Sequence, residues 1–362
     1  MIGLLESLAR PLLRMLDPED AHRLAIQALK VPPFVKLVAD DPRLAVRAFG
    51  LDFPNPIGMA AGFDKHAEVP DALLKLGFGF VEVGTVTPLP QSGNPRPRIF
   101  RLNGDEAVIN RLGFNSDGAA AVLRRLTARA NNGGIVGLNI GANRASTDRI
   151  ADYVRLIETL APVASYFSVN ISSPNTPGLR GLQQGEMLDS LLARVVDART
   201  RVSTGAIPLL IKIAPDLTLA ELDGIVSAAR KHRIDGVIVG NTTLARPLTL
   251  RERTTAKEAG GLSGRPLFAL ATRMLAETYV RVEGAFPLIG VGGIDSGDAA
   301  VAKIRAGACL VELYSALVFR GLQLVATIKS ELSDALRRDG RTRIDQLVGV
   351  DATKLIAQSW PA

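Results

Sequence analysis

The sequence predicts an α/β fold in which eight parallel strands and their helices close into a (β/α)8 barrel, the TIM-barrel fold. Eight short apolar runs recur along the chain, and segments with helical spacing lie between them. Several runs are apolar at nearly every position, which is typical of strands covered on both faces. The chain has 362 residues, of which 47% are hydrophobic, so a single barrel accounts for most of it.

The expected strands and helices alternate along the chain. Strands are expected at 57–60, 80–84, 135–140, 166–171, 209–213, 236–239, 288–291 and 309–313, and helices at 66–76, 116–130, 185–202, 218–232, 266–282 and 297–306. The segments 86–134 and 241–264 are long for connections, and long loops at the carboxyl ends of barrel strands usually build the ligand site. A doubly wound open sheet is the alternative, but no GxGxxG motif opens a helix after the first strand.

Residues 1–40 are expected to form a small extension of two helices, separate from the barrel at 41–362. The first helix has leucine at every fourth position, at Leu4, Leu8, Leu12 and Leu16, opposite a polar face. A second helix is expected at 18–31, because Asp17 can cap it and proline is favoured at a first helical position. Residues 43–53 are expected to form a hairpin at the barrel floor.

Composition narrows the possible partners. The net charge is +7, which favours anionic partners, but basic residues occur in runs no longer than a pair, so nucleic acid is not expected. No stretch approaches the roughly 20 apolar residues of a transmembrane helix, and the N-terminus lacks a signal-peptide core. The protein is therefore expected neither to span a membrane nor to be secreted.

Cysteine and histidine are too few for metal or disulfide chemistry. The single cysteine, Cys309, excludes intrachain disulfides and is expected to be a buried strand residue. The three histidines, His22, His66 and His232, are scattered, so no metal site is expected.

Polar residues stand at the carboxyl ends of the expected strands, where a barrel binds its ligand. Four asparagines offer neutral donors and acceptors suited to a planar ring that carries amide groups: Asn139, Asn170, Asn175 and Asn241. The glycine-rich stretch Gly290–Gly293 after the seventh strand predicts a phosphate-binding loop. Lys212 lies in an apolar strand, where an ammonium group needs a partner. That partner is either a core carboxylate such as Glu82 or charge on a ligand.

Ser173 follows the fourth strand. Neither His nor Asp stands near it in sequence to form a hydrolase triad, and no GxSxG motif is present. If Ser173 is catalytic, we therefore expect it to act as a base for one proton.

Nine motifs occur in a fixed order over about residues 20–320: Ala61–Lys65, Glu82–Thr87, Gly93–Arg98, Ile109–Asn115, Asn170–Arg180, Lys212–Asp216, Asn241–Thr243, Gly260–Leu267 and Gly290–Gly293. In order and spacing they resemble the quinone-dependent dihydroorotate dehydrogenases. The soluble branch of that family has cysteine where this chain has Ser173 and lacks the N-terminal helices, so the resemblance favours the quinone branch.

The resemblance implies a set of site residues, with Ser173 as the catalytic base. The positions implied for FMN are Ala61, Gly62, Phe63, Asp64, Lys65, Thr85, Asn139, Asn170, Lys212, Gly240, Gly264, Gly293, Tyr314 and Ser315. Those implied for dihydroorotate and orotate are Lys65, Asn110, Arg111, Leu112, Gly113, Phe114, Asn170, Asn175, Asn241 and Thr242. His22 and Arg101 match positions near the quinone head. Gly240 departs from the family, which has threonine or serine there, and His66 has no role that we can derive.

The implied activity is oxidation of dihydroorotate to orotate in pyrimidine biosynthesis, with FMN as electron carrier. The implied acceptor is a membrane quinone, and the protein would lie peripherally on an anionic lipid surface at the cytoplasmic face of the cell membrane. Three alternatives remain open: a soluble relative that uses fumarate or nicotinamide, a Schiff-base aldolase with Lys212 as nucleophile, and a non-catalytic barrel held at the membrane.

Overall fold

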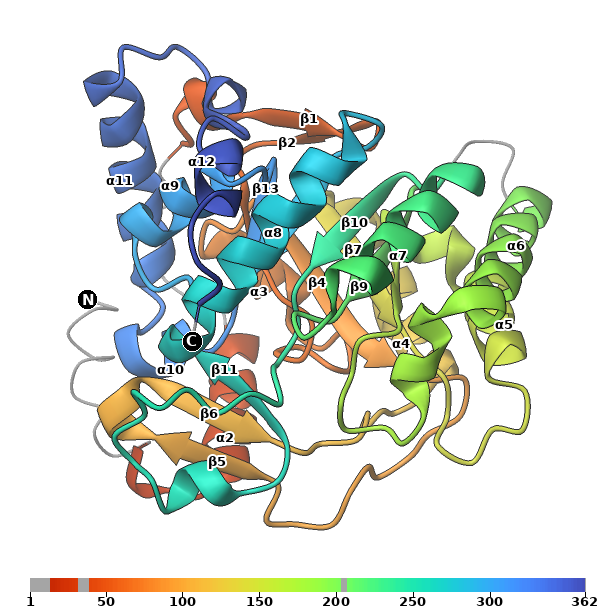
Figure 1. Cartoon of the computed structure of the whole chain (residues 1–362). Coiled ribbons are helices and arrows are strands. Elements are labelled where there is room, and N and C mark those ends of the chain that lie inside the picture. The colour runs from red at the N-terminus through yellow and green to blue at the C-terminus, as the bar shows by residue number, and fades with distance from the viewer. Residues whose placement is uncertain (1–13, 32–38, 203–206, 362) are drawn as a thin grey trace.

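The computed structural model describes residues 14–31, 39–202 and 207–361. Eight parallel strands close into a barrel in the order β3-β4-β7-β8-β9-β10-β12-β13, with β13 paired back to β3 (Figure 1). They are β3 (Ile57–Met59), β4 (Phe80–Val86), β7 (Ile135–Ile140), β8 (Tyr166–Asn170), β9 (Leu209–Ile213), β10 (Gly236–Val239), β12 (Leu288–Val291) and β13 (Leu310–Leu313). Nearly all of their residues are buried. The predicted barrel is therefore confirmed, strand by strand.

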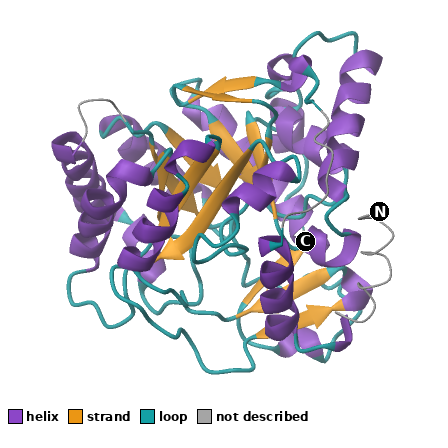
Figure 2. Ribbon diagram, turned by 180° about the vertical axis from the view of Figure 1, so that it is seen from behind, coloured by secondary structure: helices purple, strands orange, loops and turns teal. Residues whose placement is uncertain are grey.

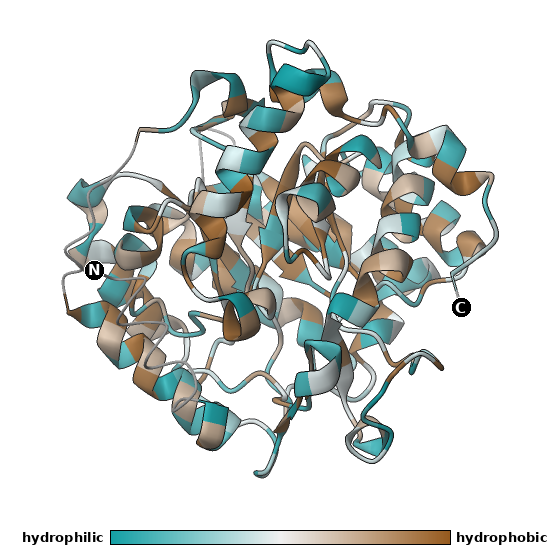
Figure 3. Ribbon diagram, turned by 90° about the vertical axis from the view of Figure 1, so that its left-hand side faces the viewer, coloured by the Kyte–Doolittle hydropathy of each residue, from teal (hydrophilic) through white to brown (hydrophobic). Residues whose placement is uncertain are grey.

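Helices surround the barrel on its outer side (Figure 2). They are α3 (Pro70–Lys75), α4 (Ala119–Ala128), α5 (Arg149–Leu160), α6 (Gly185–Val202), α7 (Leu219–Lys231), α8 (Phe268–Val282), α9 (Gly297–Arg305) and α11 (Leu324–Arg338), with α10 (Ala316–Arg320) and α12 (Ala352–Ile356) near the C-terminus. Hydrophilic and hydrophobic residues are interspersed along these helices, as expected where one face is buried (Figure 3).

The six predicted helices are confirmed, with differences at their ends. The largest concerns the helix expected at 66–76, which begins only at Pro70. The Asp64 carboxylate accepts hydrogen bonds from the backbone N–H groups of Glu68 and Val69, both at 2.8 Å, and this holds the preceding residues in a turn. Cys309, expected inside a buried strand, instead precedes β13 and is only half-buried.

The predicted hairpin at the barrel floor is also confirmed. Strands β1 (Val46–Ala48) and β2 (Leu51–Phe53) pair antiparallel at the end of the barrel where the parallel strands begin (Figure 2). The ring of Phe53 meets Phe80 edge-on, with centroids 5.2 Å apart. A Cβ atom at Gly58 would lie 2.2 Å from the Phe80 ring, so glycine at this position lets that ring fill the bottom of the barrel.

The two segments expected to be loops contribute an unforeseen antiparallel sheet at the opposite end. Its strands are β5 (Ile99–Leu102), β6 (Ala107–Asn110) and β11 (Gly261–Gly264), in the order β11-β6-β5. The sheet has a small apolar core of its own, formed by Leu102, Ala107, Ile109, Leu250, Ala256 and Leu262. The prediction of plain loops was wrong here, and the site is covered by regular structure.

Helix α2 (Pro18–Lys30) confirms the second N-terminal helix, with Asp17 as its cap. It packs against β5 and α3. The Glu19 carboxylate pairs with Arg98 at 2.6 Å, and Arg98 is only 8% exposed. The first predicted helix falls largely outside the described residues, and the division at residue 40 stays a prediction. Among the described residues, no helix has both the length and the apolar character needed to cross a membrane.

Candidate active site

A cavity of about 750 Å³ lies at the carboxyl ends of the barrel strands, between the barrel, the β5–β6–β11 sheet and α2. Figure 1 shows this sheet and α2 side by side at that end of the barrel. The cavity wall includes most of the predicted site residues: His22, Ala61, Gly62, Phe63, Lys65, Thr85, Arg101, Asn110, Leu112, Gly113, Phe114, Asn170, Ser173, Asn175, Lys212, Asn241, Thr242, Gly264, Gly293, Tyr314 and Ser315. Residues far apart in sequence thus meet in one place.

Two of the predicted ligand residues, Asp64 and Asn139, do not line the cavity but contact residues next to it. The Asp64 side chain is turned into its own loop, as described above. The Asn139 side chain supports the wall residues Thr85 and Asn170, from which its Oδ1 accepts hydrogen bonds at 2.5 and 3.0 Å.

Arg111 and Gly240 also lie outside the lining. The guanidinium group of Arg111 faces away: it pairs with Glu258 at 2.8 Å and lies 4.5 Å above the Phe100 ring. Gly240 has a φ of +122°, and a Cβ atom there would lie 2.7 Å from the Val291 carbonyl oxygen. In this conformation glycine fits, and a side chain at this position would be strained.

A chain of buried hydrogen bonds crosses the inner end of the cavity. Asn139 donates to the Glu82 carboxylate at 2.8 Å, and Glu82 accepts from the Lys212 ammonium at 3.0 Å. Lys212 also pairs with Glu312 at 3.2 Å. The core-carboxylate partner expected for Lys212 is therefore confirmed. Lys212 also lines the cavity, and its contact with charge on a ligand stays a prediction.

The charges in this cluster shift one another's pKa values. Burial alone would lower the pKa of Lys212, but the Glu312 and Glu82 carboxylates outweigh it and raise that pKa above the usual value. Burial, followed by the charge of Glu82, raises the pKa of Glu312 from 4.5 to about 8. Two acids thus share one ammonium group, and burial next to a second acid makes the Glu312 carboxyl group release its proton less readily than a free glutamate.

Sequence reasoning missed Glu312. A signal was available, because Glu312 is the only charged residue in the apolar run Leu310–Leu313, just as Lys212 is in its own strand. An acid within an otherwise apolar strand calls for a partner in the same way as a buried lysine.

Ser173 lies in the cavity wall with amide side chains from its own loop, from the end of β6 and from the loop after β10. It is 6% exposed, and its hydroxyl oxygen accepts a hydrogen bond from the Asn175 backbone N–H at 3.3 Å. Asn175 in turn donates to the Asn110 side-chain oxygen at 3.1 Å. Asn241 donates to the hydroxyl of Ser172, the neighbour of Ser173, at 2.8 Å. The arrangement offers one hydroxyl and several amide groups to a small polar ring.

Lys65 brings a cation to the same cavity. Its ammonium group donates to the Gly62 carbonyl oxygen at 2.6 Å. Burial lowers the pKa of Lys65 from 10.5 to about 8, which the charge of Glu19 partly opposes. Lys65 thus remains mostly charged at neutral pH and suits an anionic group on a ligand.

The predicted phosphate loop forms another part of the wall. Gly292 and Gly293 line the cavity together with Gly264 and Ser315. A Cβ atom at Gly293 would lie 2.5 Å from the Cα of Phe268, so only glycine lets this loop pack against the start of α8. Glycines at the end of a barrel strand can let backbone N–H groups approach an anion, so phosphate binding at this loop stays a prediction.

The cavity continues from the barrel mouth along α2, where Ala21, Ala25 and Leu29 line it. The Nε2 atom of His22 lies 2.9 Å from the Phe63 carbonyl oxygen, and its Nδ1 atom lies 3.4 Å from the Tyr314 hydroxyl. Burial lowers the pKa of His22 from 6.5 to about 3, so the ring is neutral. The His22 ring is therefore an uncharged group beside the apolar residues of α2 that line this part of the cavity.

Arg101 lies close to the chain that precedes α2. It donates to the backbone carbonyl groups of Arg14 and Leu16, at 2.8 and 3.0 Å.

Buried polar atoms without partners point to a ligand in this cavity. Within the described residues, four buried side-chain oxygens lack a hydrogen-bond partner. Three of them, on Asn115, Thr242 and Glu312, belong to residues that line the cavity. Such atoms are costly to leave unpaired, so a polar ligand fits the donors and acceptors present.

The fold and the site together define a barrel enzyme that binds a polar, partly anionic ligand at its strand ends. The family profile described as "Dihydroorotate dehydrogenase" matches residues 43–336. Proteins named dihydroorotate dehydrogenase (quinone) are 68% identical in Bradyrhizobium diazoefficiens and 69% identical in Bradyrhizobium sp. (strain ORS 278), each over 100% of both chains. A crystal structure of DHODH from Eimeria tenella in complex with ferulenol is 40% identical, with a TM-score of 0.88 over 92% of this chain and 96% of that chain.

The chain belongs to the dihydroorotate dehydrogenase family and is an oxidoreductase. The family is flavin-dependent, which agrees with the mixture of amide, cationic and glycine-loop groups in the cavity.

Proposed function

We propose that this protein oxidises dihydroorotate to orotate in pyrimidine biosynthesis, with FMN as its cofactor and a membrane quinone as electron acceptor. The observation that carries the proposal is that one cavity joins the Ser173 site to an apolar extension beneath α2. The full-length relatives named for quinone support the same acceptor.

The residues present fit FMN at the inner and glycine-lined parts of the cavity. Thr85, Asn170 and Lys212 would hydrogen-bond the flavin ring, with Ala61 and Gly62 beside it. The phosphate group would lie against the backbone N–H groups of Gly264 and Gly293 and the Ser315 hydroxyl, which now contacts Ser263 at 2.8 Å. When bound, FMN accepts a hydride from the substrate and later passes the electrons to quinone.

The chain's own residues would bind the substrate and move its proton. Lys65 would pair with the substrate carboxylate, while Asn110, Asn175, Asn241 and Thr242 would bind the amide edges of its ring. Ser173 would take the C5 proton as the C6 hydride leaves. A serine is a weak base in water, so its burial and its backbone contact with Asn175 must help to direct the proton.

The Schiff-base aldolase alternative is disfavoured. Such an enzyme needs a neutral lysine amine as nucleophile. Lys212 is paired with two carboxylates that raise its pKa, which keeps it protonated. The protein should therefore form no imine with a carbonyl substrate.

The region around α2 would bind the quinone and contact the lipid surface. His22 and Arg101 line the cavity there, and Leu24 and Val31 of this region are 49% and 68% exposed. Exposed apolar side chains beside basic ones suit peripheral binding to anionic lipid at the cytoplasmic face of the membrane. A soluble acceptor is the alternative, and the exposed leucine and valine do not favour it.

A visible spectrum tests the proposal directly. The purified protein should carry roughly one FMN per chain; dihydroorotate should bleach the flavin band without air, and a quinone should restore it. A colourless protein that gains no flavin absorbance on reconstitution would refute the cofactor assignment. Faster reoxidation by fumarate or nicotinamide than by quinone would refute the acceptor.

A further inference from the structure

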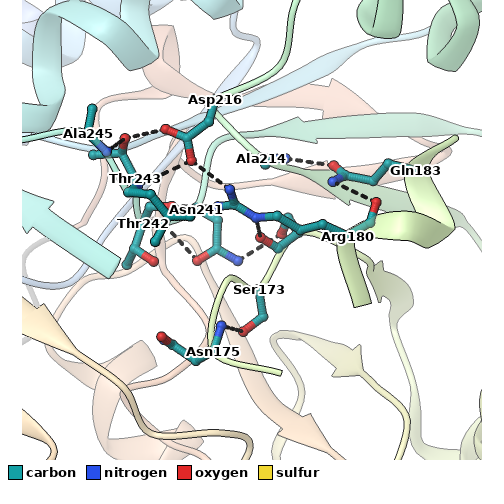
Figure 4. A network of polar contacts seen from close by, with 12 residues as sticks. Ser173, Asn175, Arg180, Gln183, Ala214, Asp216, Asn241, Thr242, Thr243 and Ala245 are labelled. Atoms are coloured by element: carbon teal, nitrogen blue, oxygen red, sulfur yellow. Dashed lines mark hydrogen bonds and ion pairs between the residues drawn. The ribbon is translucent and has the colours of Figure 1, made fainter. Parts of the chain in front are cut away.

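Arg180 joins the three loops that follow β8, β9 and β10. Its Nε atom donates to the Ser172 carbonyl oxygen at 3.0 Å, and its Nη2 atom donates to the Thr242 carbonyl oxygen at 3.2 Å. Its Nη1 atom pairs with the Asp216 carboxylate at 2.8 Å. Figure 4 shows the guanidinium group between these loops, with Ser173 and Asn241 close by.

Asp216 extends the connection into the loop after β10. It accepts hydrogen bonds from the Thr243 hydroxyl and from the Leu244 backbone N–H, the latter at 3.3 Å. The ion pair is largely shielded from solvent, since the side chains of Arg180 and Asp216 are 23% and 20% exposed. Asp216 therefore holds both Arg180 and the chain that follows Thr242.

The hydroxyl of Ser172 makes a second link between the same loops. It donates to the Asn170 side-chain oxygen at 2.9 Å and accepts from Asn241 at 2.8 Å. Ser172 immediately precedes Ser173, and Arg180 holds its carbonyl group. The position of Ser173 relative to Asn241 and Thr242 thus depends on contacts made by its neighbour.

The chemistry of arginine suits this task. A guanidinium group presents its donors in a rigid planar fork, whereas a lysine ammonium is a single point on a flexible chain. Hydrogen bonds from a charged donor are stronger than neutral ones. One arginine can therefore fix two backbone carbonyls and a carboxylate at set distances.

We propose that Arg180, oriented by Asp216, is a positioning residue that sets the Ser173 base against the substrate-binding residues Asn241 and Thr242. The inference rests on the proposed function, because it assigns Arg180 to the same reaction. Arg180 lies outside the residues that line the cavity, so it acts through Ser172 and Thr242 and not by contact with the substrate.

The test compares the conservative variants Arg180→Lys and Asp216→Asn with the parent. Arg199→Lys is the matched control, because Arg199 pairs with Asp235, which also accepts from the Leu209 backbone N–H, near the opposite end of the barrel. The measurements on FMN-loaded protein are the flavin content, the thermal midpoint, the dissociation constant for orotate, and the anaerobic flavin reduction rate over a range of dihydroorotate concentrations.

Arg180→Lys and Asp216→Asn should retain FMN, and their maximal reduction rates should fall by roughly 10- to 100-fold, the scale expected for a base displaced by about 1 Å. Orotate should bind several-fold more weakly to both. Arg199→Lys should change only the thermal midpoint. If Arg180→Lys does not fold, Asp216→Asn still decides, because asparagine keeps an acceptor oxygen for Thr243.

Unchanged reduction rates and orotate affinity in folded variants would overturn the positioning role while leaving the proposed function intact. An equal loss in Arg199→Lys would also overturn it, because the effect would then reflect stability alone. A parent protein that dihydroorotate does not reduce would overturn the proposed function and this inference together.

Discussion

Replacing Glu312 by glutamine imitates the protonated form of a carboxyl group that lies inside the barrel next to a second acid. Glu312 is fully buried, and it shares the Lys212 ammonium with Glu82. Burial and the charge of Glu82 raise its pKa from 4.5 to about 8. Between these two pH values the folded protein holds a proton that the unfolded chain has released. The stabilising contribution of this proton is therefore complete below pH 4.5 and is lost as the pH rises to about 8.

The size of this loss of stability follows from the pH range between the two pKa values of Glu312. Stability changes by roughly 1.4 kcal/mol per pH unit for each proton held only in the folded state. Between about pH 6 and about pH 9 the parent should lose on the order of 3 kcal/mol through this group. Glu312 is bonded to Lys212 and buried beside Glu82, so the loss depends on the charges of its neighbours as well as on Glu312 itself. Glutamine does not titrate, and Glu312→Gln should be spared the loss.

The assay is urea unfolding of FMN-loaded parent and variant at both pH values. The quantity compared is the difference between their free energies of unfolding, because the contributions of groups outside the cluster of Glu82, Lys212 and Glu312 cancel in it. Glu186→Gln, at an exposed site on α6, is the control and should show no pH-dependent difference. If the difference between Glu312→Gln and the parent is the same at the two pH values, Glu312 is ionised in the folded protein and the reasoning is wrong.

Three further predictions concern the reaction. Ser173→Ala should keep the flavin but slow its reduction by at least ~100-fold in stopped flow, whereas Ser173→Cys should retain some activity. A near-parental rate of flavin reduction in the alanine variant would mean that Ser173 is only a turn residue. Because Lys65 loses its charge as the pH rises through about 8, the KM for dihydroorotate should climb above that pH, and a flat KM would exclude the proposed ion pair. Deleting residues 1–40 should leave the rate of flavin reduction by dihydroorotate unchanged, but it should abolish reoxidation by a long-tailed quinone and release the protein from anionic liposomes. Unchanged reoxidation and liposome binding in the folded, FMN-loaded deletion protein would contradict the membrane and quinone role.

The barrel and the location of the site could be predicted because both depend on local pattern. Apolar runs mark strands that are covered on both faces, and the carboxyl ends of parallel strands meet at one end of a barrel. Asn170, Lys212 and Asn241 could therefore be placed together from their positions in sequence, and the structure confirms that all three line one cavity. The β5–β6–β11 sheet could not be predicted, because its strands have only four residues each and β6 pairs with a strand about 150 residues further along the chain.

The sequence by itself determined the eight-stranded architecture, the capped start of α2 and the set of residues gathered at the strand ends. Only the tertiary structure decided which way each of those side chains points: Arg111 turns outward to Glu258, and Asp64 turns into its own loop. It also decided that Glu312 joins Lys212 and that Arg180 bridges the loops around Ser173. The physical reason is that burial and strand period are properties of a segment. A hydrogen bond or a shifted pKa depends instead on distances between segments that only the folded chain brings together.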